Sequence, residues 1–353
     1  MTYKVMEGSI GARKNKNNTL RTLFLVYFED LPSLHCRTLA GLKQRQQKRG
    51  LREALSHYGP ILEIDYRREF KKHGSQGLKR IIERAADEVQ PNLILSEFHG
   101  ADMVQAPDIA ALRQKISGAR WVNWNGDYRD PQTWELKDIE LMAQFDLSLI
   151  ICHDAVREYQ RLGVRSRYWQ IGWEPDSFGD EPRKWTPRYN VLFQANCSGT
   201  RRRTLVQALR EAGFNLGLYG RGWTWFWSKG STLYDFKQGC RLIRAAKVVL
   251  SDSQWPDADG YVSNRTFESM AAGGALVMQQ YFKGFDRLGF VDAKHLVTWN
   301  DISDLIEKLR YWLRPENEEY RRAIADAGQK FCLENHSFDV RVQELVQMLA
   351  ELG

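Results

Sequence analysis

The segment with the clearest potential for chemistry is YVSNRTFESMAAGGALVMQQ, residues 261–280. Ser263 or Asn264 can cap a helix there, and the free N–H groups and positive dipole end of that helix would form an anion site. Arg265 adds a forked cation, and Glu268 lies about one turn further along, where a carboxylate can accept two sugar hydroxyls. The segment therefore predicts a ligand site. The alternative is an ordinary capped helix that stops at a glycine.

A second segment, ANCSGTRRRTLVQAL (residues 195–209), carries a run of cations where a helix is expected to begin. A strand ends in a small-residue turn, and three arginines open the helix that follows. The turn contains Ser198 and Gly199, and the arginines are Arg201, Arg202 and Arg203. Each cation at a helix N-terminus is unfavourable by roughly 0.3 to 1 kcal/mol, so three of them predict a bound anion such as a diphosphate. The alternative is that the arginines point into water.

Groups that could move a proton lie in the first half of the chain. Glu97 and His99 follow one expected strand, and Asp127 follows the next, after the turn WNWNG. A carboxylate or an imidazole at a strand end can accept a proton from a hydroxyl, so these three residues are the candidate catalytic groups. The alternative for Asp127 is that it only hydrogen bonds its own turn.

Tryptophans near these candidate sites could stack on sugar or base rings, although packing in a sheet core is the commoner explanation. They are Trp121, Trp124, Trp223, Trp225 and Trp227. The segment YGRGW, residues 219–223, places Gly220 and Arg221 beside one of them in a GxG pattern. That pattern is a weak signal by itself.

Motifs of several other enzyme classes are missing from the sequence. No GxGxxG or GxxxxGK[ST] motif follows a strand, and neither GxSxG nor HExxH occurs. Dehydrogenase, P-loop, hydrolase and metalloprotease assignments are therefore disfavoured. The seven histidines are scattered, so we expect no metal site, and the five cysteines form no CxxC pair. A disulfide framework or a zinc ribbon is therefore not supported.

The candidate catalytic and binding residues can act together only if the strands that precede them end side by side in a sheet. In the first half, short apolar runs alternate with amphipathic stretches, which predicts parallel strands joined by helices. The expected strands are 22–28, 60–66, 91–98, 120–125 and 145–152, and the expected helices are 41–58, 75–89, 108–118 and 132–143.

The pattern repeats after a break at FGDEPRKWTPR, residues 178–188, which has the prolines and mixed charge of a linker. New strands are expected at 189–195, 214–220, 247–253, 274–280 and 295–300, with helices at 201–212, 232–246 and 264–272 and three more after Asp301. The fold class is therefore α/β, with two facing Rossmann-like domains, 1–178 and 179–353. Ligands are expected beyond the carboxyl ends of the strands, in an interdomain cleft.

Charge is unevenly distributed along the 353 residues. The whole chain carries +7, yet residues 1–80 alone hold 17 Lys and Arg against 7 Asp and Glu. This surplus predicts a polyanionic partner, although each cluster could be a solvated helix face. The clusters comprise Arg13, Lys14, Lys16, Lys43, Arg45, Lys48, Arg49, Arg67, Arg68, Lys71 and Lys72. No apolar run suits a membrane helix or a signal peptide, so we expect a cytoplasmic protein without a membrane span.

The run from Tyr189 to Gln343 resembles the group 1 glycosyltransferases of the spore-maturation-protein type. The similarity rests on YGRGW, on SNRTFESMAAGGALVMQQ, on LVTWNDISDLIEKLRYWL, and on a tail with Gly328, His336 and Arg341. In the first half it rests on WNGD and QIGWEPDSF. The resemblance implies a GT-B fold, in which residues 1–178 form the acceptor domain and residues 179–353 the nucleotide-sugar donor domain.

The resemblance also implies roles by position. Glu268 would hold the ribose hydroxyls, and Arg265 with the arginine turn would hold the diphosphate. The expected donor site comprises Ser198, Gly199, Arg201, Arg202, Gly220, Arg221, Trp223, Ser263, Asn264, Arg265, Thr266 and Glu268. Retaining relatives place a second acidic residue eight positions before the ribose glutamate. Here that position is Gly260, with Asp257 and Asp259 nearby, so retention versus inversion stays open.

We therefore expect a nucleotide-sugar-dependent hexosyltransferase that uses a UDP-sugar, with UDP-glucose favoured, and that requires no metal. Because the basic surplus falls in the expected acceptor domain, the favoured acceptor is a hydroxymethylated base in duplex DNA, flipped out for transfer. One alternative is a transferase acting on a cell-surface polysaccharide or a small molecule. Another is a non-catalytic nucleotide-binding or nucleic-acid-binding protein of GT-B shape.

Overall fold

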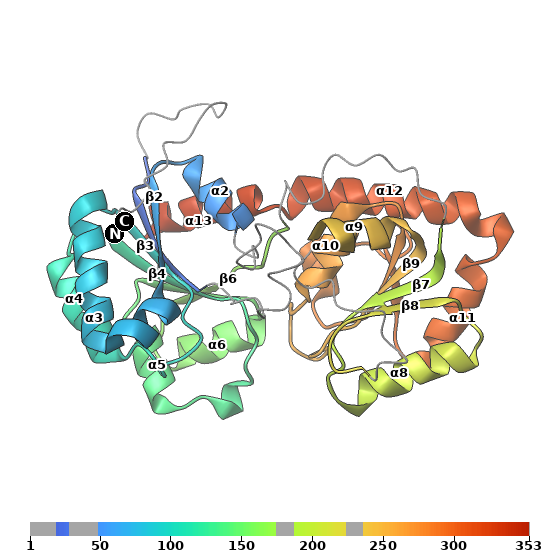
Figure 1. Cartoon of the computed structure of the whole chain (residues 1–353), viewed down its shortest axis with the longest axis horizontal. Coiled ribbons are helices and arrows are strands. Elements are labelled where there is room, and N and C mark those ends of the chain that lie inside the picture. Colours follow the sequence, from blue (N-terminus) through green and yellow to red (C-terminus); the bar gives the residue numbers. More distant parts are fainter. Residues whose placement is uncertain (1–18, 28–48, 174–186, 224–235, 353) are drawn as a thin grey trace. The chain divides into compact units, whose positions relative to one another are not determined.

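The computed structural model describes residues 19–27, 49–173, 187–223 and 236–352. The chain divides into two α/β units, each built on its own parallel sheet (Figure 1). Unit 1 contains Met1–Ile171 and Phe338–Gly353, and unit 2 contains Gly172–Ser337. The described strands confirm the expected fold class of two Rossmann-like halves.

Unit 1 has a six-stranded parallel sheet in the order β2-β1-β3-β4-β5-β6. Its strands are β1 (Thr22–Val26), β2 (Ile61–Asp65), β3 (Leu93–Ser96), β4 (Arg120–Asn125), β5 (Leu147–Ile150) and β6 (Ser166–Tyr168). Its helical elements are α2 (Arg49–Ser56), α3 (Tyr66–Val89), α4 (Ala106–Lys115), η1 (Pro131–Thr133), α5 (Leu136–Met142), α6 (His153–Arg161) and α13 (Phe338–Glu351). Every residue of β1, β3 and β5 is buried, as expected when helices cover both faces of a parallel sheet.

Unit 2 has a five-stranded parallel sheet in the order β11-β10-β9-β7-β8. Its strands are β7 (Tyr189–Gln194), β8 (Leu216–Tyr219), β9 (Ala246–Ser251), β10 (Leu276–Gln280) and β11 (Val297–Trp299). Its helical elements are α8 (Gly199–Glu211), α9 (Phe236–Arg244), α10 (Asn264–Ala272), η2 (Phe285–Leu288), α11 (Ile302–Trp312), η3 (Pro315–Asn317) and α12 (Glu318–Asn335). Helices α8 and α11 lie on one side of the sheet, and α9, α10 and α12 lie on the other (Figure 1).

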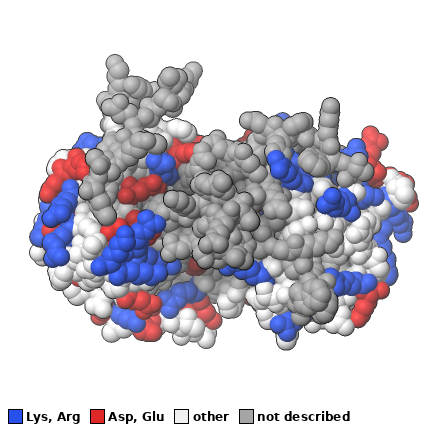
Figure 2. All heavy atoms as spheres, viewed as in Figure 1, with Lys and Arg blue, Asp and Glu red and all other residues white. Residues whose placement is uncertain are grey.

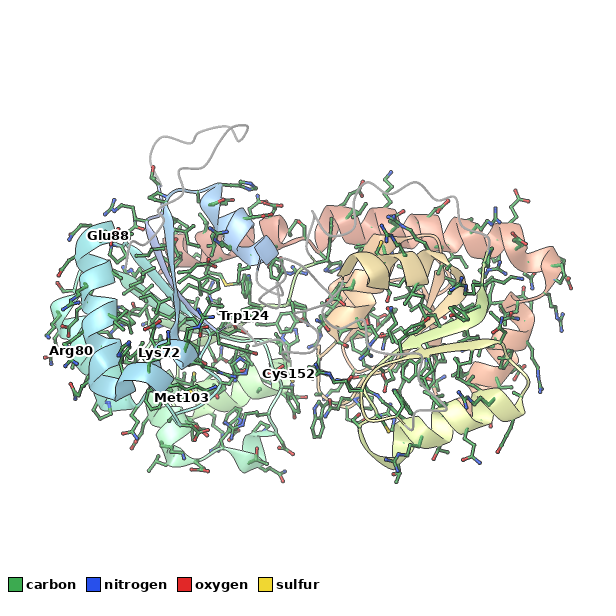
Figure 3. The ribbon with its side chains drawn as sticks, viewed as in Figure 1. Lys72, Arg80, Glu88, Met103, Trp124 and Cys152 are labelled. Carbon is green, nitrogen blue, oxygen red and sulfur yellow. The ribbon has the colours of Figure 1, made fainter. Side chains whose placement is uncertain are left out.

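The tryptophans of β4 are core residues. Trp121 and Trp124 are almost fully buried, and the Trp124 ring (labelled in Figure 3) meets the Trp169 ring edge to face at 5.2 Å within one core cluster of unit 1. Core packing is therefore the role of these two residues, rather than stacking on a ligand. Trp225 and Trp227 lie outside the described residues.

The last helix, α13, belongs to unit 1, whereas the sequence placed it in the second domain. Phe338, Val342 and Leu345 are buried in the core of unit 1, where the Trp169 indole donates to the Arg341 carbonyl oxygen at 2.8 Å. Their spacing reveals one apolar helix face, but a helix period does not reveal which sheet that face will cover. The expected boundary at residue 178 lies outside the described residues.

All ten expected strands are present, with ends that shift by no more than a few residues. Strand β6 and helix α6 were not expected from the sequence. Helix α3 begins at Tyr66 rather than at residue 75, because the Asp65 carboxylate caps it by accepting from the Arg68 backbone N–H at 3.1 Å. Gly74, at φ +65°, then interrupts its helical geometry.

Candidate functional site

The three predicted proton-transfer residues come together at the carboxyl edge of unit 1. Strands β3 and β4 are paired in parallel register, with Ser96 opposite Asn123, so the residues that follow each strand emerge side by side. The buried Asn123 fixes the first of these strand ends. Its side-chain oxygen accepts from the Phe98 backbone N–H at 2.8 Å, and its amide group donates to the Phe98 carbonyl at 3.0 Å.

His99 lies between two carboxylates. Its Nδ1 is 3.1 Å from Asp127 Oδ2, and its Nε2 is 3.5 Å from Glu97 Oε1. Burial alone would lower the pKa of His99, but the hydrogen bonds and charges of Asp127 and Glu97 outweigh burial and raise that pKa. The arrangement favours the imidazolium form, in which His99 is a poor proton acceptor.

Asp127 is the exposed member of this cluster, with 73% of its side chain accessible, whereas Glu97 is buried. The Asp127 backbone N–H donates to the Asn125 side chain at 3.2 Å, while the Asp127 carboxylate reaches His99 outside the turn. The carboxylate therefore does more than close its own turn. It is the group of the three best placed to accept a proton from a hydroxyl in solution.

An aromatic and cationic layer backs His99, and sequence reasoning missed it. The Tyr27 ring meets the His99 ring edge to face at 5.5 Å, and the Arg67 guanidinium lies 3.7 Å from the centre of the Tyr27 ring. Arg67 also donates to the Tyr66 hydroxyl, which donates to the Glu97 carbonyl. Tyr27 directly follows β1 and Tyr66 directly follows β2, so a search for polar or aromatic residues after each strand could have found both.

In unit 2, the loops after β7 and β8 are bonded to each other. The Arg221 backbone N–H donates to the Asn196 side chain at 2.9 Å, and the Trp223 indole donates to the Ala195 carbonyl at 2.7 Å. A Cβ on Gly220, at φ +149°, would lie 1.9 Å from that same Ala195 oxygen. Only glycine allows this approach, which places Gly220, Arg221 and Trp223 beside the predicted Ser198–Gly199 turn.

The arginine run of α8 meets an anion that belongs to the protein itself. Arg202 Nε and Nη2 donate to the two carboxylate oxygens of Asp252 at 2.7 and 3.0 Å, and Arg202 Nη1 donates to the Asn196 carbonyl at 2.8 Å. Arg201 bonds to the Gln280 side chain, and Arg203 Nε lies 3.3 Å from Cys197 Sγ. The unfavourable charge that predicted a ligand anion is thus offset in part by Asp252.

Asp252 was not predicted, although it directly follows β9. It also accepts from Arg265 Nη1 at 3.1 Å, so one carboxylate joins the first turns of α8 and α10. Burial would raise the pKa of Asp252, but the charges of Arg265, Arg202 and Arg201 outweigh burial and lower that pKa. The carboxylate therefore stays ionised between the arginines.

Helix α10 has the predicted bounds and cap. Ser263 is its N-cap residue, and its side chain accepts from the Arg265 backbone N–H at 3.4 Å. The Asn264 amide donates to Glu268 Oε1 at 3.2 Å. The Thr266 hydroxyl points into the fold, where it lies 2.6 Å from Gln279 Oε1 and is buried. Asn264, Arg265 and Glu268 are thus the partly exposed members of the predicted set on this helix, and Thr266 is the buried one.

The acidic residues near Gly260 have different surroundings. Asp259 is buried, and both of its carboxylate oxygens accept from Arg287 Nη1, at 3.0 and 2.8 Å. Asp257 is exposed. Within the part of the chain that the structure describes, no group of three or more His, Cys, Asp or Glu could hold a metal ion, and no helix is long and apolar enough to cross a membrane.

The fold is similar to solved glycosyltransferase structures over almost its whole length. The Anabaena protein HepE in complex with UDP-glucose gives a TM-score of 0.62 at 11% identity and covers 94% of this chain and 99% of its own. A glycosyltransferase from Rickettsia africae gives 0.63 at 13% identity, over 94% and 98% of the two chains. Sucrose-phosphate synthase from Thermosynechococcus elongatus gives 0.62 at 12% identity, again over 94% and 98%.

A sequence profile of the glycosyl transferase-like family matches residues 201–347, and no curated protein sequence matches the chain. The matched segment contains Arg202, Asp252, Arg265 and Glu268. The expected GT-B fold is confirmed, and the match to the glycosyl transferase-like profile covers most of unit 2.

Proposed function

We propose that this protein is a glycosyltransferase of the spore-maturation type that moves a hexose from a UDP-sugar, preferably UDP-glucose, onto an acceptor hydroxyl. One observation carries the proposal. Arg265 and Glu268 occupy the first turns of α10, within the segment that matches the glycosyl transferase-like family. A helix N-terminus with a guanidinium suits a diphosphate, and a carboxylate one turn further suits ribose hydroxyls. The similar structure of HepE contains UDP-glucose, which supports this donor.

We assign proton transfer to Asp127. Its exposed carboxylate would accept the proton of the acceptor hydroxyl as that oxygen attacks the anomeric carbon, and the nucleoside diphosphate would leave. His99 would hold Asp127 in place, because its Nδ1 lies 3.1 Å from the Asp127 carboxylate while its Nε2 faces the Glu97 carboxylate at 3.5 Å. An inverting transfer requires such a base, so the anomeric configuration of the product tests this assignment together with Asp127 variants.

The favoured acceptor is a hydroxymethylated base in duplex DNA. Lys and Arg side chains gather over the start of α3 (Figure 2), where Lys71 and Lys72 are exposed and Lys72 extends from the helix (Figure 3). Such a surface suits a row of phosphates. Of the other residues that motivated this proposal, Lys43, Arg45 and Lys48 lie outside the described residues, as do Arg13, Lys14 and Lys16.

A small phosphorylated acceptor is the second candidate. The same lysines would fit a single phosphate group, and one similar structure is a sucrose-phosphate synthase. A polysaccharide acceptor without charge has no matching feature on α3.

The deciding experiment incubates the protein with a panel of UDP-sugars and three acceptors: hydroxymethylated duplex DNA, the same duplex unmodified, and a sugar phosphate. We expect UDP release with hydroxymethylated DNA and a mass gain of one hexose on the modified base. A gain on the sugar phosphate alone would replace the DNA acceptor with the second candidate. Absence of both transfer and UDP-sugar hydrolysis would favour a non-catalytic binding protein.

A further inference from the structure

The carboxylate of Asp252 joins helices α8 and α10 through Arg202 and Arg265. The two arginines differ in how many of their nitrogens are hydrogen bonded. Three nitrogens of Arg202 are bonded, two to Asp252 and one to the Asn196 carbonyl. Arg265 contributes only Nη1 to Asp252. The accessible fractions follow the same order, with 9% for the Arg202 side chain and 18% for that of Arg265.

This difference leaves Arg265 as the guanidinium with spare donors. Among the residues that the structure describes, the Nε and Nη2 atoms of Arg265 have no hydrogen-bond acceptor, and the side chain is 18% accessible, so both donors are available to a ligand. A guanidinium presents its donors in a fixed plane, so fixing Nη1 on a rigid carboxylate also fixes the directions of Nε and Nη2.

A second group beside Asp252 also has unused hydrogen-bonding capacity. The Ser253 hydroxyl is buried and has no partner within the described part of the chain, whereas its backbone N–H donates to Gln280. Buried hydroxyls are normally bonded, so this hydroxyl keeps hydrogen-bonding capacity that the described residues do not use. This hydroxyl lies within residues 253–265 of unit 2. The same segment contains the N-terminus of α10 and the spare donors of Arg265.

We propose that Asp252 is a positioning residue for the diphosphate of the donor. It does not touch the ligand. Instead, Arg202 holds Asp252, and Asp252 holds Arg265 so that Nε and Nη2 face phosphoryl oxygens. This inference rests on the proposed function, because it takes the ligand to be a nucleoside diphosphate.

A purely electrostatic role for Asp252 makes the opposite prediction. If its charge only neutralised the arginines, its removal would leave more positive charge near the ligand and would strengthen diphosphate binding. Positioning predicts weaker binding, because Arg265 loses the contact that sets its direction. The sign of the change therefore separates the two roles.

The test compares UDP with uridine by isothermal titration calorimetry, using the full chain and D252N. We expect UDP affinity to fall about tenfold or more while uridine affinity is unchanged, because only the diphosphate depends on Arg265. The matched control is D259N, which breaks the buried pair of Asp259 with Arg287 in the same unit. This control should leave the ratio of UDP to uridine affinity as in the wild type.

A double-mutant cycle with R265Q shows whether Asp252 acts through Arg265. We expect R265Q to reduce UDP affinity selectively and the double variant D252N/R265Q to lose no more than the larger single loss. Additive losses would overturn the inference. If D252N does not fold, D252E replaces it. D252E keeps the charge but displaces the carboxylate, so we expect the same selective loss.

Unchanged or tighter UDP binding by D252N overturns the positioning role, and so does an equal fall for UDP and uridine. In each of these cases the wild type still prefers UDP, and the proposed donor site stands. If the wild type binds UDP no better than uridine, the proposed donor fails and the inference falls with it.

Discussion

The Nδ1 atom of His99 lies 3.1 Å from the Asp127 carboxylate, and the two residues follow neighbouring strands of one parallel sheet. His99 is largely buried, and on its other side its Nε2 lies 3.5 Å from the Glu97 carboxylate. Asp127 faces solvent. The His99 ring can fix the direction of the exposed carboxylate, which is the positioning that a proton acceptor requires.

Replacing Asp127 with asparagine tests this role. Asparagine keeps the shape of the side chain but cannot accept the proton, so we expect kcat to fall at least about a hundredfold while UDP affinity stays unchanged. Steady-state kinetics with the active acceptor, together with UDP titration, measures both quantities. A fully active D127N enzyme would move the proton acceptor to another residue.

The pH dependence of stability tests the ionisation of His99. Its pKa is raised in the folded protein, so its ion pairs stabilise fully below the unfolded pKa of about 6.5 and are lost as pH rises through the folded pKa. Urea unfolding near pH 6 and near pH 9 should therefore show a larger difference between wild type and H99Q at the lower pH. H73Q, on the exposed part of α3, is the control. An equal difference at both pH values would exclude a charged His99.

Glu268 tests the nucleoside part of the donor site. If its carboxylate accepts the ribose hydroxyls, E268A should weaken UDP binding by about 1.5 to 3 kcal/mol, the range for hydrogen bonds to a charged group. Binding of inorganic pyrophosphate, which has no ribose, should not change. Calorimetry measures both ligands, and circular dichroism checks the fold. Unchanged UDP affinity would remove Glu268 from the site.

Gly220 tests the junction of the two loops in unit 2. An alanine Cβ would lie 1.9 Å from the Ala195 carbonyl oxygen, and φ is +149°, so G220A requires the backbone to move. We expect a loss of more than about 1 kcal/mol in the free energy of unfolding, together with weaker UDP binding. G118A, with nothing within 4 Å of its new Cβ, should be near neutral. Equal stability of the two variants would contradict the close approach.

Sequence predicted both sheets because buried parallel strands are continuous apolar runs. The proximity of Glu97, His99 and Asp127 was predictable for a related reason, since residues that follow neighbouring parallel strands emerge at the same edge of the sheet. Strand β6 was missed because SRY is short and largely polar. Helix α6, HDAVREYQR, was missed although its apolar residues Ala155, Val156 and Tyr159 are buried together on one face.

The role of Asp252 could not be predicted from local sequence patterns, because it depends on contacts between residues that are far apart in the sequence. Its partners Arg202 and Arg265 lie 50 and 13 residues away, and its role depends on two helices that meet at the end of one strand. The arginine run was recognised as a charge that needs an anion, but periodicity does not distinguish a ligand from a carboxylate of the chain. The placement of α13 could not be predicted for a similar reason. The sequence shows that the helix has an apolar face, but not which of the two sheets that face covers.

The acceptor is tested by salt dependence and charge reversal on α3. If duplex DNA binds over Lys71 and Lys72, phosphates displace counterions, and log affinity should fall with log salt at a slope near −0.9 per phosphate neutralised. K71E/K72E should weaken binding to all duplex sequences alike, because phosphate contacts position a duplex without reading it. UDP affinity should be unaffected, because the proposed donor residues belong to unit 2. A variant with equal charge change in the second half of α3, R80E/R84E, shows whether the position matters. A DNA affinity that does not change with salt concentration would count against a DNA surface at the start of α3. An equal loss of DNA affinity in the two variants would also count against it.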